Sequence, residues 1–366
     1  TKEELLTNFL VENADFHGEK TASTFGHQLP FLFKCLSVAK ALSIQAHPDK
    51  SLAAKLHAND KKNYPDDNHK PELACAVTEF QGLCGFRPLS ELKAHVQQVP
   101  ELRGLIGEEA SAGLEAAEAE GEGARKTALK TAYEKLMDNG QEAVEAAAKT
   151  LIARLEAKDS AERTPAEDLV LRVNKDFPHD IGLFSIFLLN YVTLQPGQAL
   201  FLGPNLPHAY LLGDCMEIMA TSDNVVRAGF TPKFKDVSTL TGMLTYECGP
   251  ADVLDGVEEH GGAVRLYAPR SSDFPEFSLR RVTLSRSLSV TLGSSVSPRV
   301  VICVSGKATL EATPSGAASS TLTEAKLALS SGIIAVSAAK CDLTLTGGED
   351  GTALVFVASC HPTFEA

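Results

Sequence analysis

The chain has 366 residues, of which 44% are hydrophobic and 22% charged, enough for two or three domains with cores of their own. Its formal net charge of -13 argues against nucleic acid or a membrane surface as a partner. It does not exclude an anionic small molecule, which needs only a local basic cluster. No apolar run could span a bilayer, no cleavable signal pattern opens the chain, and the cysteines lack CxxC spacing. We therefore expect a cytoplasmic protein with reduced thiols.

The first segments predict helical and then β structure. From Thr1 to Lys20 the apolar residues recur at helical spacing. Leu29 to Ile44 is mostly apolar and β-rich, but Lys34 interrupts it. A lysine within an apolar strand lies at an edge or faces a negative group. A short helix is then predicted from Ser51 to His57, with Ser51 as its cap.

Two polar side chains, Gln45 and His47, lie two positions apart in an otherwise apolar stretch that ends at Pro48. On a strand this spacing points both side chains out of the same face. A ring nitrogen and an amide oxygen can bind a metal, but taken alone the pair is more simply a polar strand end before a turn. Further along, a proline precedes Glu72, and Leu73 to Val77 continues as a buried strand.

The composition changes at about Leu89. Residues 108 to 170 are dominated by Ala, Glu, Lys and Leu, and their apolar residues keep a helical period. The charged residues of this segment are most simply a solvated helix face. We interpret it as a helical insert without chemistry of its own.

β character returns from Pro178 to Ala228, with an apolar run from Leu183 to Thr193 and a proline-containing turn before His208. From about Glu276 onward, short apolar segments recur between Gly and Ser clusters. That pattern is typical of a sandwich or jelly roll. We expect His361, close to the end of the chain, to be exposed rather than catalytic.

Four polar residues interrupt strands or follow proline turns: Gln45, His47, Glu72 and His208. Two imidazoles, a carboxylate and an amide oxygen form a ligand set that zinc accepts, as would iron(II) or manganese. The four come from β-rich segments on both sides of the helical insert, so they could converge inside one barrel. Their spacing alone leaves open whether they meet.

Six stretches are long enough to compare with known families. They are Leu42-Ser43-Ile44-Gln45-Ala46-His47-Pro48, Tyr64-Pro65-Asp66-Asp67-Asn68-His69-Lys70-Pro71-Glu72, Gly85-Phe86-Arg87-Pro88, Pro207-His208-Ala209-Tyr210, Ser222-Asp223-Asn224-Val225-Val226-Arg227-Ala228-Gly229 and Thr231-Pro232-Lys233-Phe234-Lys235-Asp236-Val237. Their wording, order and spacing resemble those of the type I mannose-6-phosphate isomerases. The resemblance covers Leu29 to Val237 well. The helical insert and the C-terminal region resemble the family in composition and predicted structure more than residue by residue.

This resemblance implies a mainly β protein with two cupin (jelly-roll) β-barrels and an α-helical domain. It assigns residues 1–88 and 175–258 to a catalytic cupin, 89–174 to the helical insert and 259–366 to a C-terminal jelly roll. The family usually begins with an aromatic strand containing Tyr-Trp-Gly and later has a Trp-Met-Gly-Thr-His-Pro run. This sequence has no tryptophan and starts downstream of both. We therefore expect the catalytic cupin to lack the family's N-terminal strands.

The resemblance also implies a zinc enzyme that interconverts mannose 6-phosphate and fructose 6-phosphate and so feeds GDP-mannose synthesis. It places one zinc ion per chain on Gln45, His47, Glu72 and His208, and the catalytic arginine at Arg227. We expect a monomer whose partner is a small-molecule sugar phosphate.

Aldose-ketose isomerisation moves a proton between C1 and C2 through an enediol or enediolate. It requires a base, and positive charge where an oxygen becomes anionic. Glu217 is a candidate base because an acid in an apolar strand has a raised pKa, although a histidine or a zinc-bound water or hydroxide could serve instead. Arg227 could stabilise the enediolate, or it could form a salt bridge to Asp223.

The phosphate group needs cations or other donors. The candidate phosphate-binding residues, all bordering the motif segments, are Lys34, Lys70, Lys233, Lys235 and Ser43. Each lysine alone could be a solvated surface residue, but as a group in so acidic a chain they indicate an anionic ligand. Tyr210 could close the pocket over the sugar or belong to the core.

Two other functions are compatible with the sequence. An iron-dependent cupin dioxygenase shares the barrel and the histidine ligands, but Gln45 and the lysine cluster fit it poorly. A non-enzymatic sugar-binding or storage protein of the same fold would leave Arg227 and Glu217 unexplained. Metal analysis separates the first of these from the isomerase, and turnover of a sugar phosphate separates the second.

Overall fold

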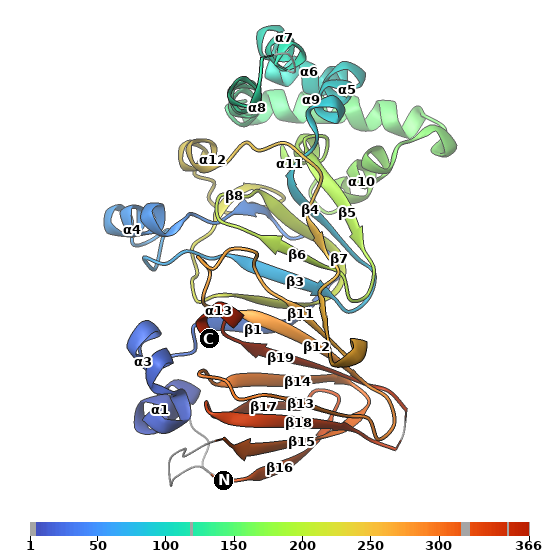
Figure 1. The fold of residues 1–366 in the computed structure, drawn as a ribbon. Coiled ribbons are helices and arrows are strands. Elements are labelled where there is room, and N and C mark those ends of the chain that lie inside the picture. The colour runs from blue at the N-terminus through green and yellow to red at the C-terminus, as the bar shows by residue number, and fades with distance from the viewer. Residues whose placement is uncertain (1–4, 118–119, 316–322, 350, 366) are drawn as a thin grey trace.

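The structure is a computed structural model that describes residues 5–117, 120–315, 323–349 and 351–365. Three parts follow one another along the long dimension of the molecule: a group of helices, a nine-stranded sheet and a two-sheet jelly roll (Figure 1). The predicted mainly β fold with a helical insert is thereby confirmed. In the described part of the chain, every helix is too short or too polar to cross a membrane.

Three short helices open the described chain: α1 (Leu6–Glu12), α2 (Ala14–His17) and α3 (Glu19–Phe25). The helix predicted from Thr1 to Lys20 is therefore interrupted at Asn13 and Gly18, and its first four positions lie outside the described residues. Gly18 has a φ of 85°, and a Cβ there would lie 2.4 Å from the carbonyl oxygen of Val296. The chain turns at this point because glycine accepts both the conformation and the close approach.

The nine-stranded sheet is organised around its longest strand, β7. Its strands are β1 (Phe31–Val38), β2 (Ile44–Ala46), β3 (Glu72–Ala76), β4 (Phe80–Phe86), β5 (Leu189–Leu194), β6 (Ala199–Leu202), β7 (His208–Ala220), β8 (Val226–Gly229) and β9 (Val253–Leu254). Four strands, β1 to β4, pair antiparallel with β7. These pairings on one long strand form a nearly closed, barrel-like sheet.

The two faces of this sheet differ because successive side chains on a strand point in opposite directions. Leu73 and Cys75 of β3 and Met216 of β7 pack with Phe277 and other apolar residues of the jelly roll. Glu72, which precedes Leu73 on β3, therefore points to the opposite face, the interior of the barrel. This alternation is what delivers polar side chains to the inside.

The helical part packs onto one end of the barrel. It consists of α5 (Leu89–Gln98), α6 (Pro100–Ile106), α7 (Glu108–Ala116), α8 (Glu122–Met137), α9 (Gln141–Ala157), the 3-10 helix η1 (Ser160–Glu162) and α10 (Pro165–Asn174). One continuous apolar cluster joins Leu102, Leu136 and Leu151 of these helices to Phe86 of the barrel. The predicted helical character of this segment is confirmed.

Two local predictions were wrong. The helix after the first motif, α4 (Lys50–Asn59), is capped by Asp49 rather than Ser51, because Asp49 Oδ1 accepts the N–H of Leu52 at 2.9 Å. The apolar run from Leu183 begins as the short helix α11 (Gly182–Ser185), and β5 starts only at Leu189. Asp180 Oδ1 accepts the N–H of Gly182 at 2.7 Å and so satisfies a free donor of this turn.

The C-terminal jelly roll consists of two sheets. After α12 (Val237–Met243), its elements are β10 (Val257–Glu259), the 3-10 helix η2 (His260–Gly262), β11 (Val264–Tyr267), β12 (Ser278–Leu284), β13 (Ser289–Leu292), β14 (Arg299–Ser305), β15 (Lys307–Pro314), β16 (Ala325–Ser330), β17 (Ile334–Ser337), β18 (Cys341–Gly347), β19 (Ala353–Ser359) and α13 (Pro362–Glu365). A sheet of order β10-β11-β12-β19-β14-β17 faces one of order β13-β18-β15-β16. Val282, Leu310, Leu343 and Val355 belong to the apolar core between them.

All eight cysteines are free thiols, as expected for reduced core residues. Six are buried, Cys248 is half-buried and Cys35 is exposed. Burial raises the pKa of the Cys75 thiol to about 12. The six buried thiols therefore act as small apolar side chains.

Candidate metal centre

Three polar side chains meet inside the barrel. Glu72 Oε1 lies 3.3 Å from His47 Nε2, and Glu72 Oε2 lies 3.3 Å from His208 Nε2. The three ligand atoms all lie within 4.8 Å of one another, and all three residues are buried. His47 follows β2, Glu72 begins β3 and His208 begins β7, so the sheet collects residues from both sides of the helical insert.

Each histidine presents the same nitrogen to this centre. His47 Nδ1 donates to the carbonyl oxygen of Asn224 at 2.6 Å, and His208 Nδ1 donates to that of Leu206 at 2.9 Å. A neutral imidazole that donates from Nδ1 carries its lone pair on Nε2. Such outer hydrogen bonds orient histidine ligands in metal sites. Both rings are therefore already turned for coordination through Nε2.

Three of the side-chain atoms that face this centre lack a hydrogen-bond partner in the part of the chain that the structure describes. Within the described residues, His47 Nε2, Glu72 Oε2 and His208 Nε2 are buried without a hydrogen-bond partner. Buried polar atoms nearly always have partners, so three such atoms in one place indicate a ligand. Two imidazole nitrogens and a carboxylate oxygen are typical zinc ligands. The residues fit a divalent metal ion.

The electrostatics of the centre favour the metal-binding protonation states. Burial lowers the pKa of His47, although the neighbouring Glu72 acts in the opposite direction. Burial alone would raise the pKa of Glu72, but His47 and His208 hold it well below its usual range. A neutral imidazole and an ionised carboxylate are the forms that a metal requires.

Gln45 and Arg227 share a face of the sheet with His208. Gln45 of β2 lies opposite His208 of β7 and opposite Arg227 of β8 in the antiparallel register. Residues directly opposite one another present their side chains on the same side. Ser43 Oγ donates to Gln45 Oε1 at 3.2 Å and orients its amide. Gln45, Ser43 and Arg227 thus gather on the face that carries His208.

The alternative role considered for Arg227, a salt bridge to Asp223, does not match the geometry. Among the described residues, Arg227 is half-buried and no ion pair joins it to Asp223. The backbone N–H of Asp223 instead donates to Asp66 Oδ2 at 2.7 Å. The guanidinium is therefore available for a ligand.

A second carboxylate, Glu217, lies on the interior face of β7. It is paired in register with Lys34 of β1, whose Nζ lies 3.6 Å from Glu217 Oε2. Burial, followed by the charge of Glu72, raises the pKa of Glu217 to about 7. Tyr210 is buried on the same strand, and burial together with the charge of Glu217 raises its pKa well above its ordinary value. The interior therefore carries a carboxyl group of raised pKa near Glu72.

The remaining lysines divide into two groups. Lys70 is buried, and its Nζ lies 3.4 Å from Glu72 Oε1, whereas Lys34 is exposed but reaches Glu217 with its Nζ. Lys233 and Lys235 line a hollow of about 820 Å³ beside the helical part. The structure therefore separates the lysines that the sequence suggested as one cluster.

A hydrogen-bond network that sequence reasoning missed supports the metal centre. The side-chain amide of Asn224 donates to the backbone oxygen of Asp66 at 2.7 Å, to Asp66 Oδ1 at 3.1 Å and to the backbone oxygen of Asn68 at 3.0 Å. It thereby fixes the Asn224 carbonyl that orients His47. Asp66 and Asn68 lie in a quoted motif stretch, but spacing does not reveal which residue they contact.

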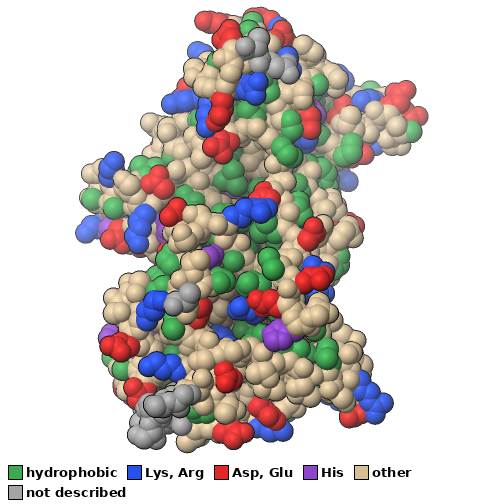
Figure 2. All heavy atoms as spheres, in the orientation of Figure 1, with side chains coloured by type: hydrophobic (Ala, Val, Ile, Leu, Met, Phe, Trp, Pro, Cys, Tyr) green, Lys and Arg blue, Asp and Glu red, His purple; other side chains and the backbone are tan. Residues whose placement is uncertain are grey.

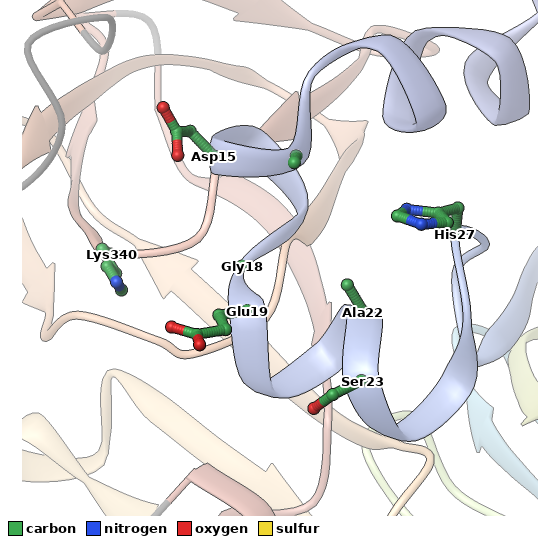
Figure 3. A pocket seen from close by; sticks show the side chains of 8 residues that line it. Asp15, Gly18, Glu19, Ala22, Ser23, His27 and Lys340 are labelled. Atoms are coloured by element: carbon green, nitrogen blue, oxygen red, sulfur yellow. The ribbon is translucent and has the colours of Figure 1, made fainter.

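A hollow of about 520 Å³ lies between the N-terminal helices and the jelly roll (Figure 3). Glu19 and Lys340 lie on one side of it and His27 on the other. Of the described residues, only His47, Glu72 and His208 form a group of three or more metal-ligating side chains. The described side chains that line this hollow do not form such a group.

The barrel and its ligand set define a metal-binding cupin protein with a helical insert. The sequence matches the family models for the catalytic domain of phosphomannose isomerase type I at residues 1–89 and for its helical insertion domain at residues 105–189. The chain belongs to the type I phosphomannose isomerase family.

Relatives with known names agree with this assignment. The chain is 48% identical over 278 residues to the mannose-6-phosphate isomerase of Rattus norvegicus, which covers 75% of this chain and 63% of the rat protein. It is 43% identical over 336 residues to that of Emericella nidulans, which covers 82% of this chain and 72% of the fungal protein. The match thus spans less than two thirds of the rat protein's length.

Solved structures are similar over nearly the whole chain. An arginine-to-alanine mutant of phosphomannose isomerase from Salmonella typhimurium has a TM-score of 0.80 and 30% identity, covering 97% of this chain and 85% of that one. A zinc-bound mannose 6-phosphate isomerase has a TM-score of 0.79 and 30% identity, with the same coverage.

Proposed function

We propose that this protein is a mannose-6-phosphate isomerase that interconverts mannose 6-phosphate and fructose 6-phosphate and so feeds GDP-mannose synthesis. The observation that carries the proposal is the buried centre at which His47, Glu72 and His208 leave three ligand atoms without partners. Zinc is its cofactor, since the ligand set suits zinc and a similar solved isomerase holds it. One ion per chain is bound by these residues and Gln45.

A bound zinc ion supplies a Lewis acid that polarises the carbonyl and hydroxyl oxygens of the open-chain sugar. Gln45 contributes a neutral ligand where a second carboxylate would neutralise the site. With only Glu72 ionised, the centre keeps a surplus of about one positive charge, which favours an anionic oxygen.

Glu217 is the proposed base. It takes the proton from C2 of the aldose, the C–H electron pair forms the C1–C2 double bond, and the C1 carbonyl oxygen becomes anionic. Glu217 then returns the proton to C1 as the C2 hydroxyl passes its proton to the C1 oxygen and becomes the ketone. A pKa of about 7 lets one carboxyl group perform both transfers near neutral pH. Lys34, 3.6 Å away, keeps the carboxylate oriented.

Arg227 is the proposed stabiliser of the enediolate. Its register places it on the face of the sheet that also carries Gln45 and His208. A guanidinium stays charged at any working pH, and one preorganised donor to an oxyanion contributes about 3 kcal/mol to the barrier reduction. The absence of an ion pair with Asp223 in the described structure supports this role.

The candidate phosphate-binding groups are Ser43 and the lysines, which offer positive charge at two places. Lys34 and Lys70 supply it beside the carboxylates of Glu217 and Glu72, and Lys233 and Lys235 supply it at the hollow near the helical part. A dianionic phosphate is recognised by such charges together with hydroxyl donors. Tyr210 closes the interior over the sugar.

We further propose a cytoplasmic monomer that acts on a free sugar phosphate and has neither nucleic acid nor a membrane as a partner. The net charge of -13 supports this, as does the mixture of acidic and basic side chains on the face shown in Figure 2. The proposed division is residues 1–88 with 175–258 for the catalytic cupin, 89–174 for the insert and 259–366 for the jelly roll.

The substrate is tested with an assay that couples fructose 6-phosphate formation to a detectable product. Mannose 6-phosphate should be turned over, whereas mannose without phosphate should not, because it lacks the group that the lysines bind. Glucose 6-phosphate tests discrimination at C2. A purified protein that holds iron instead of zinc and turns over none of these sugars would point to the dioxygenase alternative and contradict the proposal.

A further inference from the structure

One buried polar contact connects the jelly roll to the metal centre. Glu276, which lies just before β12, accepts a hydrogen bond from His69 Nε2 at 2.6 Å on its Oε1. Both residues are buried. His69 is followed directly by Lys70 and Pro71 and then by the metal ligand Glu72. The Glu276 carboxylate of the jelly roll therefore holds His69 of the catalytic barrel, which lies only three positions before the metal ligand Glu72.

Two hydrogen bonds from His361 hold the loop that carries Glu276. The N–H of His361 donates to the carbonyl oxygen of Pro275 at 3.0 Å, and His361 Nε2 donates to that of Pro269 at 3.0 Å. The sequence expectation that His361 is exposed is wrong, because the residue is buried. His361 therefore braces both ends of the short loop that precedes Glu276.

Aromatic packing completes the contact. The ring centroid of Phe274 lies 5.9 Å from that of His69 and 5.3 Å from that of Phe201 on β6. The contact lies beside the apolar interface in which Phe277 packs against Leu73. The imidazole of His69 is thus held by a ring and a carboxylate, both from the jelly-roll side.

The connection from His69 to the centre is short and stiff. Lys70 Nζ lies 3.4 Å from Glu72 Oε1, so a displacement of this segment changes a contact at the ligand itself. Pro71 has a fixed φ, and its carbonyl oxygen accepts the N–H of Ala220 at 3.1 Å. A rotation of His69 is therefore passed on to Lys70 and Glu72 rather than absorbed between them.

Stability alone does not account for a polar pair at this position. Replacing a buried charged contact by packed apolar side chains is often neutral or stabilising, and the interface around it is already apolar. Glu276 Oε2 is also buried without a hydrogen-bond partner in the described structure, which is unfavourable. A geometric requirement at the metal centre explains the pair better.

We propose that Glu276 is a positioning residue for the isomerase: by holding His69, it fixes Lys70 and Glu72 and makes the C-terminal jelly roll part of the catalytic apparatus. This inference rests on the proposed function for its kinetic consequence. Its consequence for metal binding does not depend on the substrate.

The test compares Glu276→Ala and Glu276→Gln with a control in the same jelly roll, Glu258→Ala. Glu258 forms an exposed ion pair with Arg265 and lies on the first strand of the jelly roll, β10. Three properties are measured in the 366-residue chain: the zinc dissociation constant by chelator competition, the kinetic constants kcat and KM for mannose 6-phosphate, and the melting temperature.

We expect Glu276→Ala to weaken zinc binding and to lower kcat, each by up to about tenfold. Groups that bond a metal ligand directly contribute about 10- to 100-fold, and Glu276 acts at one remove, through His69. The KM should change by less than kcat does, because Lys70 is only one of the proposed phosphate-binding residues. Glu276→Gln keeps an acceptor for His69 and should restore both values to within about threefold. Glu258→Ala should behave as the wild type.

A Glu276→Ala variant that melts earlier but keeps wild-type zinc affinity and kcat would overturn the proposal, because the contact would then be structural only. If this variant does not fold, Glu276→Asp replaces it, because aspartate is shorter by one methylene and holds its carboxylate farther from His69. This variant should show smaller losses of zinc affinity and kcat. Wild-type values of both in Glu276→Asp would also overturn the proposal. If the wild type has no isomerase activity, the proposed function fails, and the zinc affinities still decide whether Glu276 positions the centre.

Discussion

The two β parts of the molecule use the same alternation of side chains for different purposes. The interior of the jelly roll is an apolar core that includes Val282, Leu343 and Val355. The interior face of the nine-stranded sheet mixes apolar residues with Glu72 and Glu217, both nearly fully buried. A buried carboxylate is unfavourable unless it is paired or bound to a metal. The comparison shows that polar residues at some interior positions of a sheet can form a metal-binding site where apolar residues would form a core. The arrangement of the strands does not have to change.

The comparison predicts its largest effect at the metal ligands. His208→Ala removes one ligand and leaves Glu72 buried beside a single imidazole, so zinc and activity should be lost together. Metal content by mass spectrometry and the coupled assay measure both. Full zinc occupancy in this variant would contradict the ligand assignment.

Arg227→Ala should separate chemistry from metal binding. The variant should keep its zinc, and kcat should fall by about 10²–10³, as for the loss of one oxyanion donor. Arg227→Lys is the control, because lysine keeps the positive charge but lacks the planar guanidinium group and its paired N–H donors. Turnover near that of the wild type in the alanine variant would show that the arginine is structural.

The raised pKa of Glu217 predicts a pH dependence. Its carboxyl group can accept a proton only when ionised, that is, above a pKa of about 7. The logarithm of kcat should therefore fall by about one per pH unit below that value and be level above it. Glu217→Gln should lower kcat by about 10²–10⁴ and abolish this acidic limb. A wild-type limb that persists in the glutamine variant would assign the base elsewhere.

The smallest effect on catalysis is expected in the jelly-roll core. Leu343→Ala removes a fully buried side chain and should lower the free energy of unfolding by about 2–5 kcal/mol. The kcat of the folded, zinc-loaded variant should stay within about twofold of the wild type. Leu327→Ala, at an exposed position on the edge strand β16, is the matched control for stability. A large loss of kcat in folded Leu343→Ala, measured below its melting temperature, would contradict the prediction that the jelly-roll core contributes to stability but not to catalysis.

Much of the candidate site could be predicted because its residues lie in short, dense motif stretches. Gln45 and His47 share one strand end, and Glu72 and His208 each follow a proline-containing segment. The period-2 pattern then directs their side chains to one face. The sequence could not show that Glu276 reaches His69, since that contact joins residues 207 positions apart and depends on how two sheets pack.

The local errors have physical causes of the same kind. Asp49 and Ser51 are both good helix caps, and only the backbone conformation decides which one accepts the N–H of Leu52. The run from Leu183 to Leu188 is buried on all sides, so it has no polar face from which helix and strand periods could be told apart. In both cases tertiary contacts settle what the local pattern leaves open.

The most direct measurement of the central claim is zinc-dependent turnover of mannose 6-phosphate by protein whose metal content has been counted. The account predicts about one zinc per chain, activity that disappears as a chelator removes it, and recovery when zinc is added back. Protein that forms fructose 6-phosphate at an undiminished rate after the zinc has been removed would contradict it.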